Sequence, residues 1–372
     1  MPVNDDILDA LTRHAIGLSR LSTSTVRRIM KLLNASDKRI FERLMRDDLT
    51  DLGRRRQEAL LRDIRRIIDT IYTEVTGQLR LELEDLAEYE VGYQLDMFKR
   101  VLPIDVDFNA PSPDIIRAAA ISRPFAGRYL REWFKELEEG AFRRLRDTIR
   151  MGMVENQTNA ELVRQIRGTA AQGFKDGILQ QNRHAVAATV RTATNHVANA
   201  ARESLYSRNK RFIKGVQMSA TLDGRTSVRC RAVDGAVAVL EGFKRSDFEG
   251  GTIFLKDLPS FTNDSRPPFH PNCRTSSIPV LKSFRDIGLN IDVPRSTRAS
   301  MNGQVAEDIT YNDWLRKQPI AFQNDVLGKR KAQLFRKGDL HLSRFVDRNG
   351  QEYTLDELRQ REREVWKEVF GE

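Results

Sequence analysis

The feature that most constrains this chain is one apolar stripe between residues 54 and 102. Apolar residues recur there in steps of three and four, which is the spacing of a single helix face. They are Leu60, Leu61, Ile64, Ile67, Ile68, Ile71, Val75, Leu79, Leu83 and Leu86. Pro103 follows and cannot continue a helix. The pattern predicts a helix of about 70 Å, so we expect a strut, a coiled-coil arm or a helix bent once near Gly77 or Gly92.

Shorter amphipathic segments predict further helices. We expect them over residues 5–20, 24–34, 36–48, 158–168 and 181–208, with a long one after Pro124. In the segment 158–168, Thr158 or Asn159 is a suitable N-cap, Glu161 lies in the first turn and Gly168 is a stop signal.

The pattern changes near residue 210. Alternation and β-branched residues appear, and short strand-like pieces such as AVAVL and TIFL continue to about residue 282. Helical signals return from about residue 309, after a segment at 291–308 that we interpret as a linker or flexible loop.

The predicted fold class is therefore mainly α with a smaller α+β domain. Long N-terminal helices precede a small strand-and-loop domain, and helices follow it. Residues 1–110 form an N-terminal helical region with the long amphipathic helix, and residues 111–210 form a second helical region. Residues 211–290 form the small mixed domain that contains the Cys/His phrases, and residues 291–372 form a linker with a helical tail.

Composition narrows the class of protein. Sixty-two Lys and Arg against 52 Asp and Glu give a net charge of +10, which favours a polyanionic partner such as nucleic acid. Two cysteines exclude a disulfide scaffold and fit a reducing compartment. No apolar run approaches the roughly 20 residues that span a bilayer, and the N-terminus lacks a secretory h-region. We expect a soluble protein made in a cytoplasm, without a membrane partner.

Common catalytic motifs are absent. The sequence lacks the phosphate-binding loop, the dinucleotide fingerprint, H-E-x-x-H and G-x-S-x-G. His14, His184 and His196 fall on predicted helices with ordinary neighbours, where a satisfied surface or core histidine is the simplest interpretation. We therefore expect no catalytic residues and no bound organic cofactor.

One set of residues remains as a candidate metal site. Cys230 lies in TLDGRTSVRCRAVDG (221–235), and His270 and Cys273 lie three apart in RPPFHPNCRTSSIPV (266–280). Together they make a Cys₂His set, one ligand short of a closed zinc site, which Asp223 or Asp234 could complete. Two alternatives stay open: small buried thiols with a histidine that satisfies a loop carbonyl, or a disulfide.

The same phrases contain candidate turn and ion-pair residues. Asp223 and Asp234 are each followed by Gly, which is typical of turns, and Arg225 and Arg274 are available as partners. An Arg–Asp pair between these loops would hold them in place, which is a structural role.

These phrases together resemble the phage minor head protein family, the head morphogenesis or Mu F-like proteins. The resembling segments are RTATNHVANAARESLY (191–206), DGRTSVRCRAVDG, PPFHPNCRT, YNDWLRKQ and LGKRKAQLFRKGDLHLSRFVD (327–347). In the last two, the distinctive residues are Trp314, Leu315, Gln318, Leu327, Gly328, Arg330 and Leu334. The resemblance covers roughly residues 155–360.

The sequence departs from the family at one position. Family members often have R-T-C-x-x-C where this chain has Ser227 three residues before Cys230. The resemblance therefore carries over only Cys230, His270 and Cys273, and a zinc site here would lack one ligand of the fuller pattern.

The resemblance implies a virion protein at the portal vertex of the head, present in the host cytoplasm during assembly. Its implied partners are the portal protein, capsid or scaffold components and, without sequence specificity, double-stranded DNA; its implied roles are head assembly and the packaging or ejection of DNA. The alternatives are a metal-dependent nuclease built on the Cys230, His270 and Cys273 region and a host DNA-binding regulator. A nuclease needs clustered carboxylates or a histidine base beside its metal, and a regulator needs helix-turn-helix or zinc-finger spacing.

Three expectations follow from these interpretations. The N-terminal helical half should contact the portal, because the stripe between residues 54 and 102 exceeds what one small domain can cover. DNA binding should be electrostatic and salt-dependent. Cys230, His270 and Cys273 should lie close together. Two thiolates on one ion cannot be farther apart than twice a bond of about 2.3 Å, so sulfurs more than about 8 Å apart would exclude a shared ion.

Overall fold

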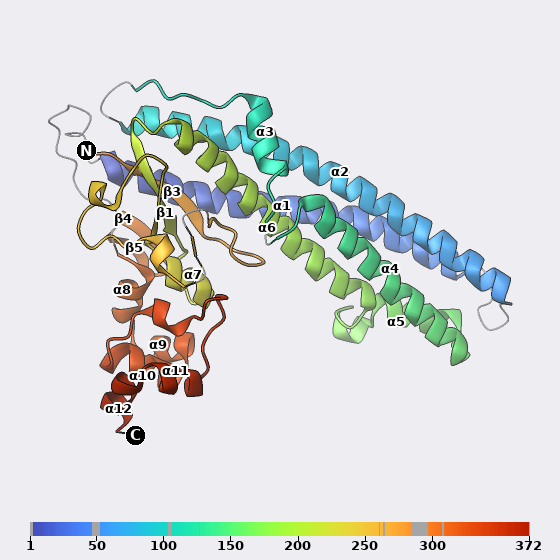
Figure 1. The fold of residues 1–372 in the computed structure, drawn as a ribbon. Coiled ribbons are helices and arrows are strands. Elements are labelled where there is room, and N and C mark those ends of the chain that lie inside the picture. The colour runs from blue at the N-terminus through green and yellow to red at the C-terminus, as the bar shows by residue number, and fades with distance from the viewer. Residues whose placement is uncertain are drawn as a thin grey trace. The chain divides into compact units, whose positions relative to one another are not determined.

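The computed structural model describes residues 3–46, 53–102, 106–125, 127–259, 261–262, 265–283, 297–306 and 309–371 (Figure 1). The α-helices are α1 (Val3–Leu44), α2 (Arg54–Val101), α3 (Pro113–Ile121), α4 (Leu130–Val154), α5 (Asn159–Arg167), α6 (Ile178–Arg208), α7 (Val228–Val233), α8 (Tyr311–Arg316), α9 (Ile320–Leu327), α10 (Lys329–Lys337), α11 (Leu355–Arg361) and α12 (Arg363–Phe370). The strands are β1 (Ile213–Ser219), β2 (Val237–Val239), β3 (Ser276–Leu281), β4 (Thr297–Ser300) and β5 (Gly303–Ala306). The predicted fold class is confirmed. Among the described helices, none combines the length and the apolar character that crossing a membrane requires.

The chain divides into two compact units, each made of separate stretches. Unit 1 comprises Met1–Gly17, Ala87–Ile116 and Ala198–Glu372, and unit 2 comprises Leu18–Leu86 and Arg117–Val197. The sequence predicts four contiguous regions, whereas helices α1, α2 and α6 each contribute residues to both units.

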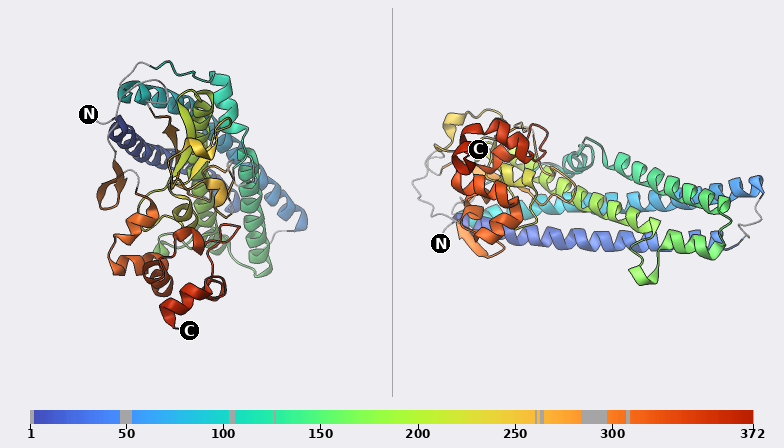
Figure 2. Two further views of the ribbon diagram at one scale, coloured as in Figure 1. Left: turned by 60° about the vertical axis from the view of Figure 1, so that its left-hand side comes forward. Right: turned by 90° about the horizontal axis from the view of Figure 1, so that it is seen from below.

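Unit 2 is built from helices that lie side by side, as two further views show (Figure 2). The apolar stripe of α2 is its core: Leu60, Ile64, Val75 and Leu79 have no exposed surface. Polar contacts join α2 to its neighbours, from Asp63 to Arg43 of α1 at 2.8 Å and from Arg65 to Glu138 of α4 at 3.0 Å. Unit 2 therefore covers this stripe internally, so the stripe does not supply the surplus surface on which the expected portal contact was based; that contact stays a prediction.

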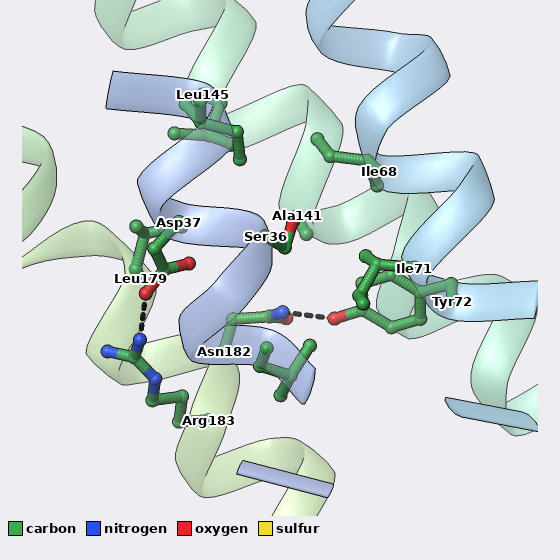
Figure 3. Close-up of a pocket in the computed structure, with 12 residues that line it drawn as sticks. Ser36, Asp37, Ile68, Ile71, Tyr72, Ala141, Leu145, Leu179, Asn182 and Arg183 are labelled. Carbon is green, nitrogen blue, oxygen red and sulfur yellow. Dashed lines mark hydrogen bonds and ion pairs between the residues drawn. The ribbon is translucent and has the colours of Figure 1, made fainter. Parts of the chain in front are cut away.

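A small cavity lies between these helices (Figure 3). Tyr72 and Asn182 form a hydrogen bond across it, and Asp37 pairs with Arg183. Burial raises the pKa of Tyr72 to about 12, so its hydroxyl stays protonated. Arg144 also donates to Asn182, and Asn34 also accepts from Arg183. The cavity has room for about one water molecule. It is a packing feature of the core.

Helix α1 differs from the prediction, which divides it into three segments. Polar residues that suggest breaks are accommodated inside one helix: the hydroxyls of Ser22 and Thr23 donate to the carbonyl of Ser19, each at 2.9 Å. Tertiary packing thus overrides the local signals, because Ile29 and Ile40 are buried in unit 2.

The short helix α5 follows the prediction closely. Thr158 is its N-cap and accepts a hydrogen bond from the amide of Glu161, and the carboxylate of Glu161 accepts one from the Thr158 amide. Gly168 ends the helix with φ of +92°, and an added Cβ there would lie 2.7 Å from the amide nitrogen of Gly177. A side chain is excluded by both the backbone conformation and the close approach.

The sheet of unit 1 is antiparallel and small. Its order is β2-β1-β3, with Val216 opposite Ala238 on one side and Pro279 on the other. The AVAVL strand prediction is confirmed by β2, but TIFL forms only an isolated bridge at Phe254 before a 3-10 helix.

The expected linker at 291–308 is only partly described. Residues 297–306 form the hairpin of β4 and β5, so this part is not a flexible loop. Residues 291–296, 307 and 308 lie outside the described residues. Beyond the hairpin, the C-terminal helices share one core with the strand region, since Leu222 packs in the cluster that contains Trp314 and Phe335.

Candidate metal centre

Two loops of unit 1 bring Cys230, His270 and Cys273 together. Cys230 lies in the first turn of α7, which Ser227 caps by accepting a hydrogen bond from the Cys230 amide. His270 and Cys273 lie on a tight turn before β3, closed by a bond from the Cys273 amide to the His270 carbonyl at 3.1 Å. Asn272 sits inside this turn with φ of 57°, a left-handed conformation that asparagine tolerates.

The three side chains converge on one point. One ligand atom from each lies within 4.8 Å of the others, and we call this set the Cys/His cluster. The sulfurs of Cys230 and Cys273 are 3.6 Å apart, and the Cys230 sulfur is 3.0 Å from Nε2 of His270. The cysteines are unbonded, and the predicted proximity is present in the structure.

The orientation of His270 directs one ring nitrogen at the sulfurs. Its Nδ1 lies 2.8 Å from the carbonyl oxygen of Pro271, which can only accept, so Nδ1 carries the proton. In the neutral ring Nε2 is then unprotonated and faces Cys230 and the hydroxyl of Ser227, the latter at 2.7 Å. This arrangement is the usual one for a metal-binding imidazole.

The electrostatics of the cluster favour one thiolate. The hydrogen bond from Cys230 lowers the pKa of Cys273, and the same interaction, with burial, raises the pKa of Cys230. The hydrogen bond with Cys273 also raises the pKa of His270. The exposed fractions of Cys230 and Cys273 are only 2% and 3%, so these groups are poorly placed to attack an external substrate.

Asp223 and Arg274 form the ion pair that was one of the predicted options. Two guanidinium nitrogens of Arg274 donate to the two carboxylate oxygens of Asp223, at 2.7 and 2.8 Å. Burial opposes ionisation, but the Arg274 bonds outweigh it and lower the pKa of Asp223. Arg225 is exposed, and its backbone amide, rather than its side chain, contacts Asp223.

Asp234 has a different role from the one considered for a metal. Its two carboxylate oxygens accept bonds from the amides of Ala220 and Tyr311, each at 2.6 Å. It therefore holds the loop after β1 to the start of α8. Within the described residues, neither Asp223 nor Asp234 joins the Cys/His cluster, so neither completes it.

A buried charged network was not foreseen in the sequence. Glu90 of α2 pairs with His14 of α1 and Arg202 of α6, each at 2.5 Å, and all three belong to unit 1. His14 is thus a satisfied core histidine, as its neighbours suggest. Sequence separations of 76 and 112 residues left no local signal for the pairing.

Comparison with known families places this geometry in context. Residues 143–278 match the model of the Phage Mu protein F like family. The family resemblance is confirmed for this segment. The match runs from within α4 to Ile278 of β3, and so includes the whole Cys/His cluster. It ends before Trp314, so the family assignment of the C-terminal block stays a prediction.

The match over residues 143–278 supports a phage head-related protein that is associated with the virion. No curated protein and no solved structure matches the chain.

Proposed function

We propose that this chain is a bacteriophage minor head protein, a portal-associated virion component that acts in head assembly and in the packaging or ejection of DNA. The observation that carries the proposal is the Mu F-like match over residues 143–278. The site chemistry supports the proposal of a non-catalytic role. The buried thiols are inaccessible, and the nearby carboxylates of Asp223 and Asp234 are engaged in structural bonds.

The charge distribution supports a DNA contact on unit 2. That unit contains 29 Lys and Arg against 20 Asp and Glu, whereas unit 1 contains 33 against 32. Almost all of the net charge of +10 therefore belongs to unit 2, although unit 1 is the longer of the two. A polyanion should be attracted to unit 2 first.

Within unit 2, helix α1 carries a row of cations. Arg20, Arg27, Lys31 and Lys38 are all exposed, and we call this set the α1 basic stripe. Their spacing of seven, four and seven residues keeps them within an arc of about 40° over about 27 Å of helix. Between Leu18 and Phe41 the only acid is Asp37, which pairs with Arg183.

The stripe is on the side of α1 that faces away from the core. Ile29, Leu33 and Ile40 are buried, and helical spacing puts them opposite the cations. A solvated helix face usually mixes both signs of charge, whereas this face carries no acid between Arg20 and Lys38; at its end, Lys38 pairs with the exposed Glu42 at 3.8 Å. We infer that it contacts the phosphate backbone of double-stranded DNA without reading its sequence.

Salt titration tests the DNA contact. The full chain is titrated with a fluorescent duplex of arbitrary sequence, and the logarithm of affinity is plotted against the logarithm of salt. Each phosphate contact contributes about 0.9 to the slope, so replacing all four stripe residues by Gln should lower it by about 3–4.

The matched control replaces four exposed lysines of unit 1 by Gln, with the same change in net charge; they are Lys256, Lys317, Lys329 and Lys337. This variant should change the slope by less than about 1. Equal losses in the two variants would remove the stripe from the proposal. Absence of binding by the wild-type chain at low salt would remove the DNA contact altogether.

Portal association is tested by co-expression with the portal protein of the same phage, followed by affinity purification. Stable co-purification supports the proposal, and its absence contradicts it. The full chain must be used: deleting residues 1–150 would remove parts of both units, because each is assembled from distant stretches. The four-Gln stripe variant should still co-purify, which separates portal binding from DNA binding.

A further inference from the structure

The Cys/His cluster has the dimensions of a metal site. Two thiolates bound tetrahedrally at about 2.3 Å lie about 3.8 Å apart, and the sulfurs of Cys230 and Cys273 are 3.6 Å apart. A disulfide would need them at about 2.05 Å. The spacing is therefore close to that of a shared ion, and the imidazole at 3.0 Å from Cys230 needs only a small outward shift.

The charges and the outer shell also fit a divalent ion. Two thiolates neutralise the ion, so a buried site carries no net charge and avoids a large desolvation cost. The Nδ1 proton of His270 is held by the Pro271 carbonyl, which fixes the tautomer with Nε2 available for the ion.

The hydroxyl of Ser227 lies beside the Cys/His cluster. Oγ of Ser227 lies 2.7 Å from Nε2 of His270, while it also caps α7. A neutral hydroxyl is a weak zinc ligand compared with a thiolate. Ser227 is therefore close to the cluster but chemically a weak ligand, so a stronger ligand at this residue is a direct test of the site.

We propose that Cys230, His270 and Cys273 bind one Zn²⁺, with the Ser227 hydroxyl or a water molecule as the fourth ligand. The ion joins the start of α7 to the turn before β3, and its role is structural because both sulfurs are buried. This proposal does not depend on the portal or DNA contacts. Binding is of moderate affinity, and the fold survives chelation, since the core around Trp314 and Phe335 does not include the cluster.

The test measures Zn²⁺ and Co²⁺ binding to the full, reduced chain after chelator treatment and dialysis. We expect one ion per chain, and with Co²⁺ the absorption of tetrahedral thiolate coordination. Cys273→Ser should abolish both signals. Because that variant could fail to fold, the decisive one is Ser227→Cys, which completes a Cys₃His set. Losing an outer-shell partner alone costs about 10–100-fold in metal affinity, so adding a thiolate should tighten binding at least about tenfold.

Ser246→Cys is the matched control, because it adds an exposed thiol in unit 1 at a residue that is not part of the cluster. It should leave metal affinity unchanged. Wild-type chain that takes up no metal would overturn the proposal. Equal gains in the two cysteine variants would also overturn it, since they would mean adventitious thiol binding.

Discussion

The two parts of helix α2 bury different chemistry. Residues 54–86 belong to unit 2, and their buried face is dominated by aliphatic side chains such as Ile64 and Leu79. Residues 87–101 belong to unit 1, and their buried face includes Glu90 and Gln94, neither of which has any exposed surface. One continuous helix therefore contributes an apolar core to unit 2 and a charged core to unit 1.

The two buried faces differ in how strictly they fix the positions of the packed helices. An aliphatic face is stabilised by burial, which is roughly proportional to area and tolerates small shifts. Glu90 instead needs Arg202 and His14 at hydrogen-bond distance, because an unpaired buried carboxylate is strongly unfavourable. Gln94 extends the network by donating to Glu90 at 2.9 Å and accepting from the Tyr206 hydroxyl at 2.9 Å. The network thus fixes the register of three helices within unit 1.

The largest effect should come from breaking this network. Glu90→Ala leaves the Arg202 guanidinium buried and unpaired, and we expect a loss of about 3–5 kcal/mol in the free energy of unfolding. Urea denaturation followed by circular dichroism measures it.

The control combines Glu90→Leu with Arg202→Leu. Replacing both charges by apolar side chains should recover much of the loss, because no charge is then left unpaired. A double variant no more stable than Glu90→Ala would show that the network contributes through its shape rather than its charge.

The next largest effect should be on the pH dependence of stability, which Glu90 in the second part of α2 should increase at low pH. Burial alone would raise the pKa of Glu90, but the charge of Arg202 and the bond from His14 outweigh it and lower that pKa to about 2. The stabilisation is present above the unfolded pKa near 4.5 and is lost as pH falls through about 2. It amounts to roughly 3 kcal/mol. Unfolding free energies between pH 6 and pH 2 should fall less steeply in Glu90→Ala than in the wild type; parallel profiles would contradict the assignment.

The aliphatic part should respond to lost volume and not to pH. Ile64→Val removes one buried methylene from unit 2, and we expect a cost of about 1 kcal/mol. The cost should be the same at pH 6 and pH 3, as judged from urea midpoints. A strongly pH-dependent cost would mean that charged groups also contribute to this core.

The smallest effect should come from the peripheral ion pair of unit 2. Glu82 accepts from Arg28 and from the Thr25 hydroxyl, but the Arg28 side chain is 45% exposed. Glu82→Ala should cost at most about 1 kcal/mol, and less at high salt because solvent screens exposed pairs. A loss as large as that of Glu90→Ala would remove the contrast between the two parts of the helix.

Local signals were sufficient for several elements. The periodicity of α2, the capping residues Thr158 and Glu161, and the stop at Gly168 act within a few residues, so the sequence predicts them correctly. The prediction for α1 is wrong because hydroxyl residues suggest breaks, and only packing against other helices shows that the helix continues. The expectation that the apolar face of α2 exceeds what the fold can cover also depended on packing, because other helices of unit 2 bury that face.

The sequence predicted the three converging residues of the candidate site but not what surrounds them. A histidine and a cysteine three residues apart on a turn, with the only other cysteine in a second loop, were enough to expect the three side chains near one point. From the sequence, either Asp223 or Asp234 could have been the fourth ligand of a metal site, and nothing favoured one over the other. The structure assigns Asp223 to Arg274 and Asp234 to backbone amides, and it places Ser227 beside His270.

The sequence by itself determined the helical class, the long α2, the Mu F-like phrases and the excess of positive charge, because each is a property of residue types and short spacings. Only the tertiary structure decided that Glu90 meets Arg202, that the apolar stripe of α2 is covered within unit 2, and that the charge excess belongs to that unit. These facts depend on pairs of residues far apart in the chain. Such pairs are set by how whole helix faces pack, which no local pattern encodes.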